Sequence, residues 1–115
     1  RRILHAVSAM AQFDVHRNTG KHRDDIPYVL LVQSSQFDNY RRRVVVPLVC
    51  KAALGKIANQ HFNPTFKIEG IPVVLHPLEI VSIPNEQLGE FVTSLESSGT
   101  IISDALDELL TQAWK

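Results

Sequence analysis

The residues whose chemistry could serve a functional site are mainly histidines and arginines, and their spacing decides what they can do. The histidines are His5, His16, His22, His61 and His76. They follow no metal-ligand spacing, and a structural zinc ion needs four ligands of the right type. The sequence also lacks a glycine-rich phosphate loop and the HExxH, CxxC and GxSxG motifs. We therefore expect no catalytic residues, no metal site and no cofactor.

Arg41, Arg42 and Arg43 form the one local concentration of charge in the chain. Two interpretations of this cluster stay open. It is either a solvated turn that leads into a buried strand, or a set of guanidinium groups that hold carboxylates in bidentate pairs. The second interpretation would suit an acidic peptide partner.

Three residues near the C-terminus also have a plain and a functional interpretation. Asp107 and Glu108 lie on the polar side of a predicted helix, where the plain interpretation is a solvated face. Trp114 either packs back onto the fold or anchors a partner, because tryptophan is enriched at binding hot spots.

Length and composition bound the class of protein. A chain of 115 residues is enough for one domain, and its formal net charge of zero gives no electrostatic argument for specific nucleic-acid binding. No stretch approaches the roughly 18 apolar residues of a membrane span. The single cysteine, Cys50, follows the apolar run 44–49. We therefore expect a buried, inert thiol and a reducing cytoplasm.

Residues 1–9 are expected to lie outside the domain. Met10 is the only methionine and stands directly before a strand-like start. The apolar part of residues 1–9 is too short for the core of a signal peptide. We therefore expect a non-native or mis-assigned extension over residues 1–9 and a single domain over residues 10–115.

Alternating and β-branched patterns predict a series of short antiparallel strands. They cover residues 12–16, 27–33, 44–46, 65–68, 72–76 and 78–84, with a weaker pattern over 87–92. Glu69 and Gly70 predict a hairpin turn between two of them. Pro47 has no amide proton, so we expect it to end the regular pairing of its strand or to mark a bulge or an edge. Residues 51–58 could form one or two helical turns interrupted by Gly55.

The end of the chain has the apolar spacing of a helix face. The residues on this face are Ile101, Ile102, Ala105, Leu106, Leu109, Leu110 and Ala113. Little other chain is left to cover the face, so we expect a homodimer with the C-terminal helices near its two-fold axis.

Several short segments resemble the CcdB family of toxins, and they keep the order and spacing of that family. They are residues 10–15 (MAQFDV), 31–34 (LVQS), 42–48 (RRVVVPL), 81–84 (VSIP) and 102–110 (ISDALDELL). The most specific match is 42–48. The resemblance covers residues 10 to about 110.

This resemblance implies a mainly β fold, in which antiparallel strands form a small SH3-like barrel with a small extra sheet and one C-terminal α-helix. It also implies a cytoplasmic homodimer that binds the A subunit of DNA gyrase and traps the cleaved-DNA complex. A CcdA-type antitoxin would neutralise it, and neither a membrane nor specific nucleic-acid binding is implied. By position, the gyrase-binding residues would be Gln12, Phe13, Ser34, Gln36, Phe37, Asp104 and Asp107. Trp114 would substitute for the terminal apolar anchor of the family. The antitoxin-binding residues would be Asn18, Lys21, Arg41, Arg42 and Arg43.

The tail departs from the family pattern, which usually ends in Gly-Ile. Here Thr111, Gln112 and Ala113 occupy those positions, with Trp114 and Lys115 beyond. One alternative is therefore a module of the same fold that binds an antitoxin but no longer poisons gyrase. Another is an endoribonuclease of the MazF type, which shares the fold and would need an acid–base set near a phosphate-binding arginine. His16 with Arg17, or residues 41–43, would have to supply that set.

Overall fold

The computed structural model describes residues 11–111, and within that range the mainly β fold with a C-terminal helix is confirmed. The strands are β1 (Asp14–Arg17), β2 (Tyr28–Leu31), β3 (Arg42–Cys50), β4 (Thr65–Ile68), β5 (Ile71–Leu75), β6 (Val81–Pro84) and β7 (Phe91–Ser94). The helices are α2 (Lys51–Leu54) and α3 (Gly99–Thr111), with 3₁₀ turns η1 (Ser35–Phe37), η2 (Pro77–Glu79), η3 (Asn85–Gln87) and η4 (Glu96–Ser98).

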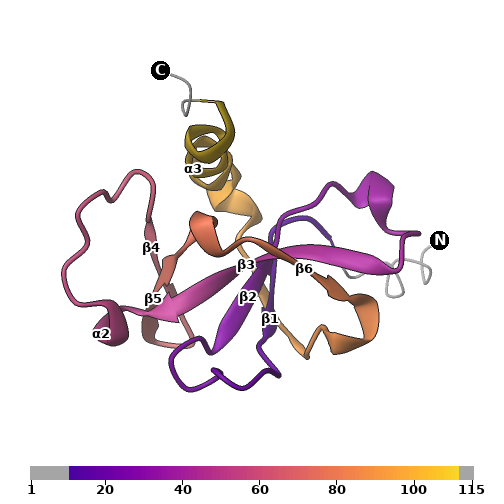
Figure 1. Ribbon diagram of the computed structural model, residues 1–115, viewed down its shortest axis with the longest axis horizontal. Coiled ribbons are helices and arrows are strands. Elements are labelled where there is room, and N and C mark those ends of the chain that lie inside the picture. The colour runs from indigo at the N-terminus through magenta and orange to yellow at the C-terminus, as the bar shows by residue number, and fades with distance from the viewer. Residues whose placement is uncertain (1–10, 112–115) are drawn as a thin grey trace.

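The strands form one curled antiparallel sheet in the order β4-β5-β3-β2-β1-β7, and β6 pairs with β3 outside this order. The expected small extra sheet is therefore joined to the main sheet through β3. Figure 1 shows the strands curling into an open half-barrel, with α3 above it. This arrangement leaves β6 as a sheet edge among the described residues.

Of the alternatives predicted for Pro47, the one in which it ends the regular pairing of its strand is wrong. Strand β3 continues to Cys50, and Pro47 pairs with Val29 of β2. The His76 amide donates to the Pro47 carbonyl at 3.2 Å, at the point where the neighbour of β3 changes from β6 to β5. The nitrogen and carbonyl of a strand residue point to the same side. The missing amide proton therefore falls in the gap between two neighbouring strands, where no ladder bond is lost.

The predicted β4–β5 hairpin is confirmed. Glu69 and Gly70 have φ values of 52° and 81°, as the favoured two-residue hairpin turn requires. Of the one or two helical turns predicted over residues 51–58, one forms, and Gly55, with φ of 71°, ends it after residue 54. Two predicted strands also begin late, because residues 77–79 and 85–87 form 3₁₀ turns.

The main core lies between the curled sheet and α3. Its buried members include Val15, Tyr28, Leu30, Val46, Leu48, Ile68, Val73, Leu75, Ile102 and Ala105. The predicted apolar face of α3 is only partly buried. Ile102 and Ala105 are 0% exposed, whereas Ile101 is 51% and Leu110 70% exposed. The helix is therefore attached to the sheet by a narrow stripe of side chains.

Candidate functional site

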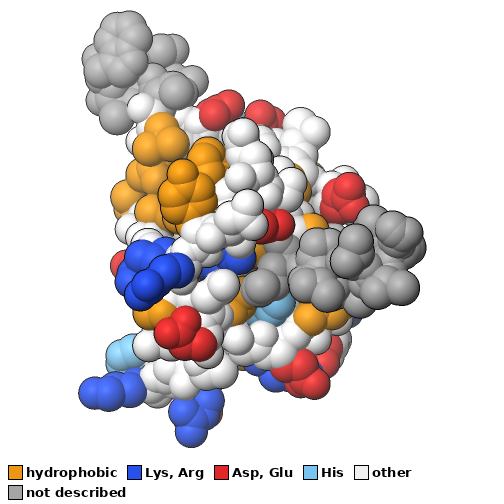
Figure 2. Space-filling view, turned by 90° about the vertical axis from the view of Figure 1, so that its right-hand side faces the viewer, with side chains coloured by type: hydrophobic (Ala, Val, Ile, Leu, Met, Phe, Trp, Pro, Cys, Tyr) orange, Lys and Arg blue, Asp and Glu red, His pale blue; other side chains and the backbone are white. Residues whose placement is uncertain are grey.

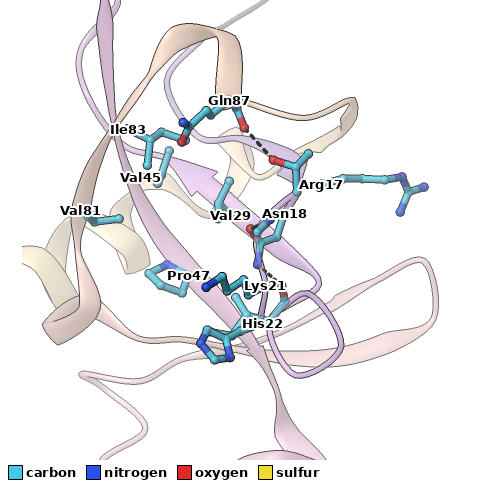
Figure 3. Close-up of a pocket in the computed structure, with 13 residues that line it drawn as sticks. Arg17, Asn18, Lys21, His22, Val29, Val45, Pro47, Val81, Ile83 and Gln87 are labelled. Atoms are coloured by element: carbon cyan, nitrogen blue, oxygen red, sulfur yellow. Dashed lines mark hydrogen bonds between the residues drawn. The ribbon is translucent and has the colours of Figure 1, made fainter.

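A groove of about 240 Å³ lies on the outer face of the sheet, and we call it the outer groove. Valine and proline side chains of β2 and β3 form its floor, β6 forms one wall, and the β1–β2 connection forms the other (Figure 3). Its lining residues are Arg17, Asn18, Thr19, Gly20, Lys21, His22, Ile26, Val29, Val45, Pro47, Val81, Ile83 and Gln87. An apolar floor with a few polar groups on the rim is typical of a binding site.

Asn18 builds the wall of the outer groove that the β1–β2 connection forms. Its Nδ2 donates to the Ile26 carbonyl at 2.7 Å, and its Oδ1 accepts from the Gly20 amide at 3.0 Å. Thr19 Oγ1 donates to the Gln87 carbonyl at 3.1 Å and ties this wall to η3. The predicted binding residue Asn18 is therefore engaged in holding the loop, whereas Lys21 is exposed beside the groove.

Arg17 lines the same groove, but its guanidinium points away from it (Figure 3). The guanidinium donates to both carboxylate oxygens of Glu69, at 3.0 and 2.8 Å, and to Glu90 at 3.2 Å. The Tyr28 hydroxyl also donates to Glu69, at 2.6 Å. This network joins β1, β2, the β4–β5 turn and the segment before β7. Arg17 is therefore paired at the surface with two carboxylates, which would compete with a phosphate for its guanidinium.

The network shifts the ionisation of its members. The Arg17 guanidinium, and after it the Tyr28 hydroxyl, holds the pKa of Glu69 below its ordinary value. The two carboxylates raise the pKa of Arg17 in return. Asp14, which is buried in β1, shows the opposite behaviour, because desolvation raises its pKa.

The lowered pKa of Glu69 predicts a pH effect on stability. Ionised Glu69 stabilises the fold above the pKa of an unfolded glutamate, and this contribution is lost as the pH falls through the lowered pKa. We therefore expect Glu69→Gln to be less stable than the wild type at neutral pH and to lose less stability below about pH 4.5. Asp14 is unchanged in both proteins, so the difference between their curves isolates Glu69.

The check is a pair of urea denaturation series between about pH 3 and pH 7. Parallel stability curves for the wild type and Glu69→Gln would contradict this assignment.

The three consecutive arginines have three different environments. Arg43 is 1% exposed, and Arg42 is exposed but donates to the Ser82 hydroxyl and carbonyl, both at 2.7 Å. Arg41 is exposed and, with Arg42, lines a cleft of about 420 Å³. We call this cleft the arginine cleft; its lining residues are Arg41, Arg42, Pro84, Asn85 and Glu86. The expected surface cluster of guanidinium groups is corrected to Arg41 and Arg42, because the fold buries Arg43.

The outer groove and the arginine cleft lie on opposite faces of the β3–β6 ladder. Successive strand residues point to opposite faces. Val45 lines the groove and packs in a small cluster with Ile83, whereas Val44 packs on the main core. Arg42 shares the face of Val44 and is paired with Pro84 across the ladder. A single peptide that used both recesses would have to pass around the β6 edge.

Among the predicted gyrase-binding residues, Gln12 and Phe13 lie where three segments meet. Gln12 Nε2 donates to the Val32 carbonyl at 3.0 Å, and the Phe13 amide donates to the Leu31 carbonyl at 2.6 Å. The Phe13 ring is so close to α3 that a Cβ on Gly99 would lie 2.9 Å from it. The start of β1, the end of β2 and the start of α3 therefore meet at Phe13.

The residues after β2 form a structured loop at the right of Figure 1. Ser34 Oγ accepts from the Gln36 amide at 3.3 Å and caps η1. Gln36 is exposed, and the Phe37 ring packs against the Tyr40 ring with 5.7 Å between ring centroids. Phe37 and Tyr40 are 43% and 64% exposed. Figure 2 shows that hydrophobic side chains gather beside Lys and Arg side chains on this side of the molecule.

The other predicted gyrase-binding residues are less closely placed. Asp104 and Asp107 are exposed on α3, on the side away from the core. Trp114 lies outside the described residues. Gln12 and Phe13 thus lie against the end of β2, from which the loop with Ser34, Gln36 and Phe37 begins, whereas the two aspartates lie on the exposed side of α3.

His16, which a ribonuclease mechanism would need, is 4% exposed. Its Nδ1 lies 2.8 Å from the Gly89 carbonyl and its ring packs edge-on against Phe91.

Within residues 11–111, no group of three or more His, Cys, Asp or Glu side chains could hold a metal ion. Cys50 is a free, half-buried thiol rather than the fully buried one expected, because it stands at the very end of β3. No helix in the described part of the chain is long and apolar enough to cross a membrane.

Sequence reasoning missed three features of this surface. It gave no reason to bury Arg43, to pair Arg17 with a glutamate 52 positions away, or to single out Tyr40. One feature of the sequence could have indicated the Arg17–Glu69 pair: Glu69 occupies a turn position that glycine, asparagine or aspartate would normally fill.

Comparisons with known proteins agree with this fold. A family model described as "CcdB protein" matches residues 12–112. Among solved structures, a mycobacterial endoribonuclease in complex with its cognate antitoxin is similar, with a TM-score of 0.69 and 14% identity over 91% of this chain and 98% of that chain. A second mycobacterial endoribonuclease has a TM-score of 0.63 and 14% identity, over 87% and 89% of the two chains. These structures show the fold alone. No curated protein sequence matches the chain.

Proposed function

Since this chain belongs to the CcdB family of toxins from toxin–antitoxin systems, we propose that it binds the A subunit of DNA gyrase and traps the cleaved-DNA complex. We further propose that it acts in the cytoplasm and that a CcdA-type antitoxin neutralises it. In this proposal the protein acts by binding, without a catalytic site of its own.

One observation carries the choice of binding over RNA cleavage. The general base that phosphoryl chemistry would use is enclosed by the fold, because His16 is buried against Gly89 and Phe91, and the neighbouring Arg17 is paired with Glu69 and Glu90 at the surface. A general base must reach the proton that it removes. The surface instead presents the Phe37 and Tyr40 rings, and aromatic residues are enriched at protein interfaces.

An endoribonuclease is the second candidate, because the fold is similar to that of two mycobacterial endoribonucleases. Arg41 and Arg42 would be its accessible cations, since Arg43 is buried. This candidate has to be tested beside the first one.

The experiment titrates the full chain with a gyrase A fragment, assays gyrase-dependent DNA cleavage, and incubates the same protein with single-stranded RNA. We expect gyrase binding, accumulation of cleaved DNA and intact RNA. Phe37→Ala should weaken gyrase binding by about tenfold, as truncation of an interface aromatic commonly does. Ile71→Ala is the matched control, because Ile71 is 39% exposed, close to the 43% of Phe37, and lies at the β4–β5 hairpin.

Each of the other outcomes would assign a different function to this chain. Cleaved RNA without gyrase binding would replace the proposal by the endoribonuclease. Antitoxin binding without gyrase binding or RNA cleavage would leave a module of the same fold that has lost its toxic activity.

We propose the outer groove as one antitoxin contact, because its apolar floor with Lys21 at the rim suits an apolar and acidic peptide. Arg41 and Arg42 provide a second contact on the other face of the ladder. The solved complex of the similar mycobacterial endoribonuclease with its cognate antitoxin supports an antitoxin partner for this chain.

Lys21→Glu tests the groove. Reversing this charge should weaken binding of an antitoxin peptide by about tenfold at low salt, and the loss should shrink as salt is added. Lys67→Glu on β4 is the control, because it makes the same charge change at an exposed site away from the groove. Since the two recesses lie on opposite faces, Arg41→Ala with Arg42→Ala should weaken binding independently of Lys21→Glu. Equal effects of the two lysine variants would reject the groove as a specific contact.

We also propose a homodimer that buries the exposed side of α3, where Leu110 is 70% exposed. Light scattering at micromolar concentration is the test, and a strictly monomeric protein would reject this assembly.

A further inference from the structure

We propose that the buried Arg43 is a positioning residue that fixes the loop over residues 34–42, and that the loop thereby presents the Phe37 and Tyr40 rings as one rigid contact unit for the protein target. Only the identity of that target rests on the proposed function. The positioning itself rests on the contacts of Arg43.

The Arg43 side chain is 1% exposed, and its hydrogen bonds all end on backbone carbonyls of the loop. One terminal nitrogen donates to Tyr40 at 2.7 Å and to Arg42 at 3.0 Å, and the other donates to Asp38 at 2.7 Å. The Nε atom is buried and without a partner. A buried cation is unfavourable unless it is well satisfied. An apolar residue at position 43 would avoid that penalty, but it could not hold the three loop carbonyls that Arg43 contacts.

The loop closes on itself around these contacts. The amides of Phe37, Asp38 and Tyr40 donate to the carbonyls of Ser34, Ser35 and Phe37, at 3.0, 3.1 and 3.1 Å. Gln33 fastens the loop to β3, since its Nε2 donates to the Phe37 carbonyl at 3.3 Å and its Oε1 accepts from the Val44 amide at 2.8 Å. Gln33 therefore holds the loop at Phe37, and Arg43 holds the carbonyls of the residues that follow.

The contact unit is the pair of rings that this backbone carries. The Phe37 and Tyr40 rings meet edge to face, with an interplanar angle of 66°, and both remain substantially exposed. A preorganised aromatic pair loses little conformational entropy on binding, and tyrosine is enriched at binding hot spots. Lysine could not replace Arg43, because a single ammonium group lacks the planar fork that reaches several carbonyls at once.

The first test measures the loop without any partner. Trypsin can cut after Arg41 and Arg42 only when this segment leaves its folded shape. Arg43→Met and Arg43→Lys should both speed cleavage after Arg41 and Arg42 by about tenfold, as expected when local opening becomes more frequent. Lys67→Met on β4 should leave the rate unchanged. Thermal unfolding of each variant shows whether the change is local, and Arg43→Lys serves if Arg43→Met does not fold.

The second test is a double-mutant cycle with a gyrase A fragment. Tyr40→Ala should weaken binding by about tenfold in the wild-type background and by less than about twofold when Arg43 is already Met. This dependence would not arise from a merely structural loss of stability, which leaves the effect of Tyr40→Ala unchanged.

Unchanged proteolysis in both Arg43 variants would overturn the positioning role, and independent effects of Arg43 and Tyr40 on binding would overturn the contact unit. If the wild-type chain binds no gyrase, both the proposed target and the proposed contact unit are rejected. The proteolysis result then still decides whether Arg43 positions the loop.

Discussion

Gly89→Ala is expected to lower the free energy of unfolding by about 3 kcal/mol, at the upper end of what inserted atoms usually cost in a packed site. A Cβ at position 89 would lie 2.3 Å from the Arg17 carbonyl oxygen and 3.0 Å from Thr19 Cγ2. The first of these atoms belongs to the backbone of β1 and cannot rotate away. The strand would have to shift, and the bond between the Arg17 amide and the Glu90 carbonyl, now 2.9 Å, would be strained with it.

Gly99→Ala is the matched control. Its Cβ would also be crowded, at 2.9 Å from Phe13 Cε2, but it would meet a side chain. Residue 99 has φ of −56° and is the first residue of α3, where alanine is favoured over glycine by less than the ~1 kcal/mol of a helix interior. We therefore expect a change of about 1 kcal/mol or less for Gly99→Ala. Denaturant titration of both variants is the check, and equal losses of stability would contradict the backbone clash at residue 89.

Ile102→Ala is expected to lower the free energy of unfolding by about 3 kcal/mol, through lost apolar burial and the cavity left behind. Ile102 and Ala105 are the fully buried residues of α3 in the described part of the chain, and Ile102 is the larger of the two. The adjacent Ile101 has the same side chain but is 51% exposed, and Ile101→Ala should lower the stability by less than about 1 kcal/mol.

Urea denaturation of the two isoleucine variants compares one chemical change at a buried and an exposed site. In Ile102→Ala we also expect faster amide exchange along α3, because the helix loses its main contact with the sheet. Similar losses for both variants would show that α3 is attached differently from the arrangement described here.

Much of the fold could be predicted from local patterns in the sequence. The Glu69–Gly70 turn, the strands beside it and the apolar spacing of the last helix are short-range signals, and each matches an observed element. Pro47 misled the prediction, because a missing amide proton matters only where a neighbouring strand would accept its bond. Which strand lies beside Pro47 is a long-range property of the sheet.

The candidate binding surfaces were harder to predict from the sequence. Asn18 and Lys21 lie in one loop, as predicted, but the valine floor beneath them combines Val29 of the next strand with Val45 of β3, and only the pairing of the strands brings these together. Exposure of Phe37 and Tyr40 also could not be inferred from residue type, since both rings are large enough to be core residues.

The sequence by itself determined the mainly β class, the C-terminal helix and the family, because these depend on residue order and on local periodicity. Only the tertiary structure decided which charged residues are buried, which form ion pairs and which remain exposed. Arg41, Arg42 and Arg43 are identical in type and adjacent in sequence, but strand alternation and the folded loop bury Arg43 and leave the other two at the surface. Arg17 forms ion pairs with Glu69 and Glu90 because the curl of the sheet brings these two glutamates beside it. Burial and pairing are set by distant segments, and these decide whether a charged side chain is free to meet a partner.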